Sequence, residues 1–213
     1  MIRILSISDE IDPLVYSNNI KSRYGNIDLV LSCGDLPFNY FDFIVSSLNV
    51  PLFYVLGNHP PPMKPSKDML WLENTPPGCI NLDNKVIKYK NLILGGFEGS
   101  IRYNNDRWSK QYTNFEMQNK IRKTYPRLLW NRLVHKRAID ILITHAPPLG
   151  IHDREDPCHR GFAPFLGYMK HFAPRYLIHG HVHLYDRNET WRSRYLATEV
   201  INTYGARVIE IED

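Results

Sequence analysis

Short apolar runs that each end in a polar side chain, often beside a glycine, constrain the fold of this 213-residue chain most strongly. The first three are "IRILSI" (2–7), "DLVLSC" (28–33) and "PLFYVL" (51–56). They predict buried strands, and residues 14–23 and 40–48 between them predict short helices. A β-α-β-α-β order favours parallel strands, whose carboxyl ends meet at one edge of a sheet. Ligand sites in such sheets form along that edge.

The rest of the chain continues the alternation of strands and helices. Residues 79–99 predict strands joined by turns, with Asp83 and Asn84 as a hairpin tip, and 138–148 predicts another buried strand. Helices are expected over 114–137, kinked or divided by Pro126, and over 161–172. A strand follows at 175–183, and two last strands flank a turn at Tyr204-Gly205. With no repeat and no linker, the pattern predicts one α/β domain over residues 1–213, with mixed strands and helices outside.

Composition excludes several classes of protein. With 43% hydrophobic and 23% charged residues the chain is typical of a globular protein, and no apolar run is long enough for a membrane span. The start, "MIRILSISDE", lacks the features of a signal peptide. Cys33, Cys79 and Cys158 are few and scattered, which favours reduced thiols. We therefore expect a cytoplasmic protein without membrane association.

Positive charge is the one compositional hint of a nucleic-acid partner. The formal net charge is +4, and Lys and Arg gather in residues 120–137. The solvated face of a helix explains this cluster better than a nucleic-acid surface does, so nucleic acid is possible but not favoured.

The residues just past the strands predict a metal site. Carboxylate, amide and imidazole groups occur there, at Asp9, Asp35, Asn58, His145, His181 and His183. Each alone is an ordinary turn, cap or strand-end residue, although alternation does place His181 and His183 on one side of an extended chain. Together they are a mixed O/N donor set that suits first-row divalent ions. They are too many for one tetrahedral ion, and Asp35 could bridge two ions about 3.5–4 Å apart.

The order of these motifs resembles a known family. "GD" at 34–35, "GNH" at 57–59, a lone strand-end His145 and "GHVH" at 180–183 resemble the calcineurin-like metallophosphoesterases over nearly the whole chain. "THAPPLGIHDREDPCHRGF" resembles small prokaryotic-type members. The resemblance implies a four-layer α/β/β/α sandwich of two mixed sheets. It also implies a binuclear centre of Mn, Fe, Zn, Ni or Co at one edge.

Roles follow from the resemblance position by position. It implies that Asp9, Asp35 and His183 bind one ion and that Asp35, Asn58, His145 and His181 bind the other. His59 is then catalytic, helping to protonate the leaving group or to stabilise the transition state. The implied reaction is hydrolysis of a small phosphomonoester or phosphodiester by a hydroxide that bridges the metals.

The chain departs from the family at Ile11. The family places a ligating histidine two residues after the first aspartate, and Ile11 cannot ligate. The first ion therefore lacks a nitrogen ligand. The alternatives are weaker binding of this ion, an extra water ligand, or recruitment of Asp12 or Glu10. Asp12 also suits a cap or turn before Pro13. His179 shares the alternation of His181 and His183 but lies inside the strand, so we expect it to be packed with a hydrogen-bond partner.

Substrate contacts are expected from the loop 146–161, which follows His145. Arg160 and His159 are our substrate-binding candidates, because a guanidinium matches phosphate oxygens. His152 and Asp153 are further candidates in this loop, and Arg102 and Tyr103 are weaker ones. Two alternative functions remain open: a nuclease, and a non-catalytic or weakly active binding scaffold favoured by Ile11. The oligomeric state is left open.

Overall fold

Two large sheets form the centre of the molecule. A computed structural model describes residues 1–59, 75–106, 109–186 and 188–212. The first sheet has the order β13 (Gly205–Ile211), β1 (Ile2–Ser8), β2 (Leu29–Ser32), β3 (Leu52–Tyr54) and β4 (Cys79–Asn81). The second has the order β11 (Arg192–Tyr195), β12 (Thr198–Asn202), β10 (Tyr176–His179), β9 (Ile141–Thr144), β6 (Leu92–Phe97) and β5 (Lys85–Tyr89). A small sheet pairs β7 (Ser100–Ile101) with β8 (Gln111–Tyr112).

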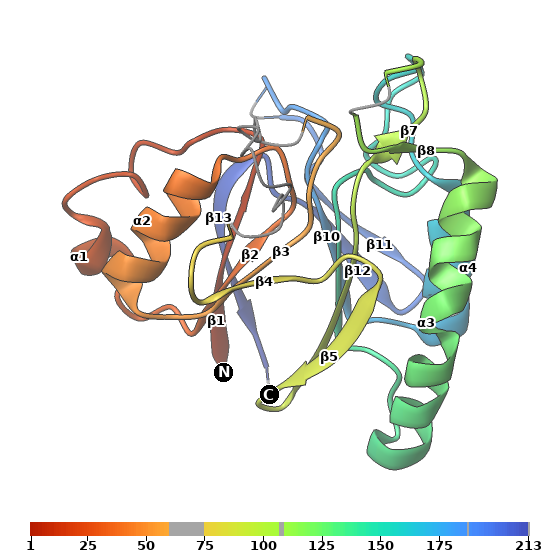
Figure 1. The fold of residues 1–213 in the computed structure, drawn as a ribbon, viewed down its shortest axis with the longest axis horizontal. Helices are drawn as coiled ribbons and strands as arrows, with labels where there is room; N and C mark the ends of the chain where they lie inside the picture. Colours follow the sequence, from red (N-terminus) through yellow and green to blue (C-terminus); the bar gives the residue numbers. More distant parts are fainter. Residues whose placement is uncertain (60–74, 107–108, 187, 213) are drawn as a thin grey trace, which may run out of the picture.

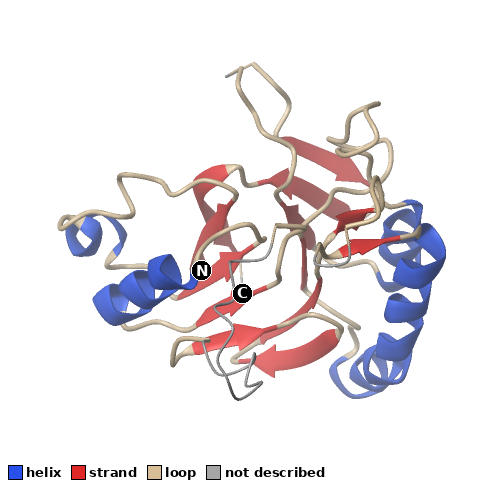
Figure 2. Cartoon of the chain, turned by 45° about the horizontal axis from the view of Figure 1, so that its top comes forward, coloured by secondary structure: helices blue, strands red, loops and turns tan. Residues whose placement is uncertain are grey.

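Helices cover the outer face of each sheet. The helices α1 (Ile20–Tyr24) and α2 (Phe38–Leu48) lie on one flank, and α3 (Asn114–His135) and α4 (Ala163–Phe172) lie on the other (Figure 1). Figure 2 shows the sheets between these two helical flanks. The expected four-layer α/β/β/α sandwich of two mixed sheets is therefore confirmed. Within the described residues, no helix combines the length and apolar character that crossing a bilayer requires.

Three apolar clusters separate the layers, and β1 shows how they arise. Ile4 belongs to the cluster between the two sheets, whereas Leu5 and Ile7 pack under α1 and α2. A strand buried on both faces needs apolar side chains at successive positions, which explains the continuous run "IRILSI". The third cluster joins the second sheet to α3 and α4 through residues such as Leu128 and Phe165.

The helix α3 is one continuous helix, so the expected division at Pro126 is wrong. A capping box at Thr113 and Glu116 satisfies backbone donors at its start. Pro126 itself is solvent-exposed, while Leu128 is fully buried. Packing of this apolar side against the sheet outweighs the single hydrogen bond that a proline removes.

Three local predictions differ from the structure. Asp83 and Asn84 are not a hairpin tip, because they connect β4 in the first sheet to β5 in the second. The hairpin joins β5 to β6 instead, at Lys90, whose φ is 49°. The expected strand from residue 194 onward is also divided, since the chain reverses at Leu196 to pair β11 with β12. The helix expected over 14–23 is reduced to α1, preceded by turns.

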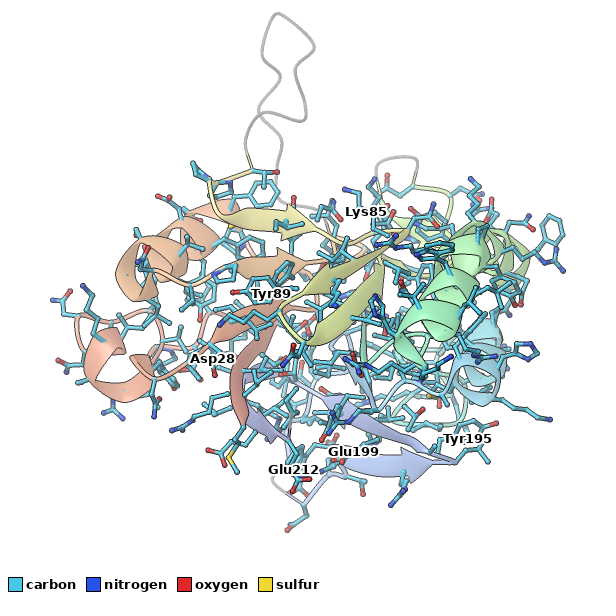
Figure 3. The ribbon with its side chains drawn as sticks, turned by 90° about the horizontal axis from the view of Figure 1, so that it is seen from below. Asp28, Lys85, Tyr89, Tyr195, Glu199 and Glu212 are labelled. Atoms are coloured by element: carbon cyan, nitrogen blue, oxygen red, sulfur yellow. The ribbon has the colours of Figure 1, made fainter. Side chains whose placement is uncertain are left out.

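The parallel strands of both sheets end at the same side of the molecule. β1, β2 and β3 run parallel in one sheet, and β6, β9, β10 and β12 run parallel in the other. Their carboxyl ends and the loops that follow face upward in Figure 1. Figure 3 shows the opposite side, with Asp28 before β2 and Glu199 on β12. These carboxylates have local partners, since Asp28 accepts from the Arg3 backbone and Glu199 pairs with Arg192.

Neighbouring leucines on α3 provide a test of this packing. Leu128 is fully buried and Leu129 is 52% exposed. Leu128→Ala should lower the free energy of unfolding by about 2–5 kcal/mol, because it leaves a cavity under the helix. Leu129→Ala should change it by less than about 0.5 kcal/mol. Denaturant titration followed by circular dichroism measures both, and equal losses would contradict the described packing.

Candidate metal centre

All the predicted metal ligands come together at the carboxyl edge. Asp9, Asp35 and Asn58 follow β1, β2 and β3 of the first sheet, and His145, His181 and His183 follow β9 and β10 of the second. Most of them surround a cavity of about 410 Å³, which is lined by Asp9, Asp35, Asn58, His59, Tyr103, Cys158, His159, His181 and His183. His145 is fully buried and contacts the lining residues from below. The two sheets thus contribute equally to one site.

Three atoms that can ligate a metal meet at the buried ring of His145: its own Nε2, Asn58 Oδ1 and Asp35 Oδ2. His145 Nδ1 donates to the backbone carbonyl of Cys33 at 2.7 Å, so in the neutral ring Nε2 carries a lone pair. That lone pair faces Asn58 Oδ1 at 2.9 Å and Asp35 Oδ2 at 3.5 Å. Tyr103 fixes the amide in this orientation by accepting from Asn58 Nδ2 at 3.3 Å. Acceptors facing one another repel unless a proton or a cation lies between them, so this group fits a bound metal ion.

A second set of acceptors surrounds Asp9. Ligand atoms of Asp9, Asp35 and His145 all lie within 4.8 Å of one another. His183 Nε2 lies 4.0 Å from Asp9 Oδ1, while its Nδ1 is hydrogen-bonded to the Tyr185 hydroxyl at 2.8 Å. Burial raises the pKa of Asp9 above its usual value, because a charged carboxylate is poorly solvated there. A cation at this position would remove that penalty.

The ring of His181 is held in the tautomer that a metal ligand requires. Its Nε2 donates to the backbone carbonyl of Cys158 at 2.6 Å, which leaves Nδ1 with the lone pair. Burial lowers the pKa of His181 well below its usual value, so the ring is neutral. The backbone N–H of His181 donates to Asp9 Oδ2 at 2.9 Å, which orients that carboxylate as well.

The ligand residues have unusual backbone conformations. Asp9, Asp35 and His181 have φ values of 65°, 55° and 66°, in the left-handed region. Non-glycine residues seldom adopt it, and each instance costs on the order of 1–3 kcal/mol. The fold holds them there by hydrogen bonds, such as the bond from the His59 backbone N–H to Asp35 Oδ1 at 2.9 Å.

Two glycines permit the close approach of the strand ends. A Cβ atom at Gly57 would lie 1.8 Å from Asp35 Oδ1, and one at Gly180 would lie 1.9 Å from Ser8 Oγ and 2.4 Å from Asp9 Oδ2. Real Cβ atoms do not come this close to other atoms. The "GNH" and "GHVH" motifs therefore need glycine because the neighbouring ligand occupies the space of a side chain.

The candidates to replace the histidine missing at Ile11 are engaged elsewhere. Ile11 is 39% exposed and is not among the described residues that line the cavity. Asp12 Oδ1 accepts from the backbone N–H of Leu14 at 2.7 Å, so it shapes a turn. Glu10 is hydrogen-bonded to the Tyr204 hydroxyl, and burial and this carboxylate raise the pKa of Tyr204 to about 12.

The substrate-binding candidates on the loop 146–161 lie in different positions relative to the cavity. His159 lines the cavity, and its Nδ1 is bound to the Asp156 carboxylate at 2.9 Å. Arg160 is exposed and is not one of the described lining residues, so its contact with a substrate stays a prediction. Asp153 shapes the loop by accepting from the backbone of Gly150 and of Gly161.

His152 faces away from the cavity, toward the buried His179. The two rings are hydrogen-bonded, from Nδ1 of His152 to Nε2 of His179, at 3.1 Å. His152 Nε2 then bonds the Ser193 hydroxyl at 2.8 Å. The prediction that His179 is packed with a hydrogen-bond partner is confirmed.

The two weaker substrate-binding candidates, Arg102 and Tyr103, also lie in different surroundings. Arg102 is bound to both carboxylate oxygens of Glu116 at 3.0 Å, as in a solvated turn. Tyr103 lines the cavity and orients Asn58.

Comparisons with known proteins agree with this geometry. The calcineurin-like phosphoesterase family matches residues 3–185. The chain belongs to this family. No curated protein is significantly similar to it in sequence.

Solved structures share the fold at low sequence identity. The protein TT1561 of Thermus thermophilus is 12% identical with a TM-score of 0.64, and the match covers 95% of this chain and 89% of that one. The phosphopantetheinyl hydrolase of Mycobacterium tuberculosis is 12% identical with a TM-score of 0.55, covering 94% and 88%. GAP50 of Plasmodium, described as an anchor in the inner membrane complex, is 14% identical with a TM-score of 0.51, covering 95% and 71%.

Sequence reasoning missed several groups that support the ligands. The Cys158 carbonyl, which accepts from His181, has no side-chain signal. Tyr204 stacks on His183 with ring centroids 4.7 Å apart, but it lies far along the chain in the turn before β13. Tyr185 was the easiest of the three to find, because it follows His183 by two residues, although the strand expected over 175–183 ends at His179 and the alternation does not continue.

Gly180→Ala tests the close approach of strands at the site. The new methyl group would displace Asp9 and Ser8, so we expect metal content to fall strongly in the purified, reconstituted protein. Gly167→Ala in α4 is the matched control, because a Cβ there has open space and alanine is the better helix former. Elemental analysis after dialysis against Mn²⁺ measures both variants. Full metal content in Gly180→Ala would contradict the crowding described here.

Proposed function

We propose that this protein is a metal-dependent hydrolase of small phosphomonoesters or phosphodiesters, with a binuclear centre at the carboxyl edge. The observation that carries the proposal is the convergence of ligand atoms of Asp35, Asn58 and His145, with His145 Nε2 lying 2.9 Å from Asn58 Oδ1 and 3.5 Å from Asp35 Oδ2. Two divalent ions, of Mn, Fe, Zn, Ni or Co, would supply Lewis acidity toward phosphoryl oxygens and a water of lowered pKa. Asp9, Asp35 and His183 would hold one ion, and Asp35, Asn58, His145 and His181 the other.

His59 has the position of a proton donor to the leaving group. It lines the cavity, and its side chain is exposed. Its backbone is anchored to Asp35 Oδ1, so the ring stays beside the metal ligands. An imidazole titrates near neutral pH and can give a proton to a departing oxygen.

A nuclease receives little support from the charge distribution. The Lys and Arg residues of 120–137 lie largely on the exposed side of α3, as for Arg122, Lys123 and Arg127. This helix covers the outer face of the second sheet and runs away from the carboxyl edge (Figure 1). A basic surface leading into the cavity is what a nuclease requires.

A binding scaffold is the second candidate, and Ile11 favours it. An incomplete ligand set weakens the binding of one metal ion and slows the reaction that depends on that ion. Hydrolysis of bis-(p-nitrophenyl) phosphate and of p-nitrophenyl phosphate, with and without Mn²⁺, separates the two functions. Metal-dependent turnover of either ester supports the hydrolase. Bound metal without turnover of any phosphoester supports the scaffold.

His59→Ala tests the role of this side chain apart from the metal. Turnover should fall by about 10²–10⁴-fold, because the leaving oxygen loses its proton donor. Metal content should stay at the wild-type level, because the contact with Asp35 is made by the backbone. His171→Ala, on exposed α4, is the control. Parallel loss of metal and turnover in His59→Ala would contradict the assignment.

Asp35→Asn tests the bridging carboxylate. The amide oxygen can still accept from the His59 backbone, but the bridging charge is lost, so occupancy of both ions should fall together. Asp12→Asn changes the charge in a turn outside the cavity and should leave both ions bound. Calorimetric titration with Mn²⁺ measures both variants. Two tightly held ions in Asp35→Asn would refute the bridge.

A further inference from the structure

The first ion of the proposed centre is short of ligands. It has Asp9, Asp35 and His183, whereas the second has four protein ligands. Ile11 cannot coordinate, Asp12 shapes a turn, and Glu10 binds Tyr204. Among the described residues, a further protein ligand for this ion would come from another segment that reaches the cavity.

His159 is a histidine that reaches this cavity and is not one of the six predicted ligands. It lines the same cavity as Asp9, Asp35 and His183. Its ring centroid is 6.5 Å from that of His183 and 5.2 Å from that of His181. With metal–nitrogen bonds of about 2.1 Å, imidazoles that share an ion have ring centres roughly 4.5–6.5 Å apart. The spacing of His145 and His181, at 4.7 Å, is similar.

Asp156 prepares the ring of His159 for ligation. Its carboxylate accepts from His159 Nδ1 at 2.9 Å, from the His159 backbone N–H at 3.1 Å and from the Cys158 thiol at 2.8 Å. With the proton on Nδ1, the lone pair of the neutral ring is on Nε2. A carboxylate behind a histidine in this way orients metal-ligating rings in many sites and makes them more basic.

We propose that His159 is the ligand that replaces the histidine missing at Ile11, binding the first ion through Nε2 with Asp156 as its positioning residue. This inference rests on the proposed binuclear centre. It reassigns His159 from the substrate to the metal. Loop 146–161 then supplies one ligand through His159 and orients another, His181, through the Cys158 carbonyl.

Metal-free protein titrated with Co²⁺ tests the inference without any measure of turnover. Wild type should bind two ions. In His159→Gln the affinity for one Co²⁺ ion should fall at least about tenfold, and the affinity for the other ion should be retained. Asp156→Asn should weaken the binding of the same ion by a smaller factor. Proton NMR of the cobalt protein should show a shifted, exchangeable imidazole N–H resonance that is missing in His159→Gln. Circular dichroism confirms that the variants fold.

His171→Gln, outside the cavity, is the matched control and should bind two ions as wild type does, whereas Cys158→Ser tests whether the thiol is a ligand. Asp156, Cys158 and His159 could instead hold a separate ion through the thiolate. A thiolate-to-cobalt absorption band that Cys158→Ser removes would show that site and overturn the inference. Wild-type affinity for both ions in His159→Gln and Asp156→Asn would overturn it too, while the binuclear centre would stand. Wild type that binds a single ion would refute both proposals together.

Discussion

Lone pairs that face one another at the carboxyl edge are the constraint on which this structure depends. Asn58 comes from the first sheet and His145 from the second, so their contact is also a contact between the sheets. When the His145 ring is neutral, the contact without a cation is repulsive, and the buried Asp9 beside it has a raised pKa. A cation bound there would convert these unfavourable terms into favourable ones. Metal binding and the docking of the two sheets are therefore linked, and ions bound only by the folded chain would stabilise it.

The strained backbone of the predicted ligand residues is explained by their position at the same edge. Asp9, Asp35 and His181 each leave a parallel strand and turn at once into the left-handed region. Such strain persists only where surrounding structure over-determines it. Here the hydrogen bonds between ligands serve that purpose, as the His181 backbone bound to Asp9 does. These three residues adopt a backbone conformation that their residue types seldom prefer, as residues of functional sites often do.

The sequence predicted the layers and the convergence of the six predicted ligand residues at one edge, because both depend on local patterns. Strands buried on both faces show as unbroken apolar runs, and the polar residues that follow mark the edge. The course of the chain between sheets was not predictable in this way. Asp83 and Asn84 have the composition of a hairpin turn, yet they connect two sheets. Pro126 is a strong local signal against a helix, but the buried side of α3, including Leu128, outweighs it. Contacts made by a carbonyl, such as that of Cys158, have no sequence signature.

The position of the loop 146–161 depends on a chain of hydrogen bonds behind the site. His179 Nδ1 donates to the Gly180 carbonyl, so its Nε2 accepts from His152 Nδ1, and His152 Nε2 accepts from Ser193. Burial lowers the pKa of His152 to about 4 and that of His179 to about 3, so both rings are neutral near pH 7. Each ring then has one N–H donor and one acceptor nitrogen, so every hydrogen bond in this series donates in the same direction, from Ser193 toward the Gly180 carbonyl. The loop that carries the Cys158 carbonyl is thus tied to β10 and β11 by bonds that do not change across the neutral pH range. These bonds hold the start of the loop against the second sheet, so under the proposed assignment a metal ligand on this loop also depends on packing behind the site and not on the first motif alone.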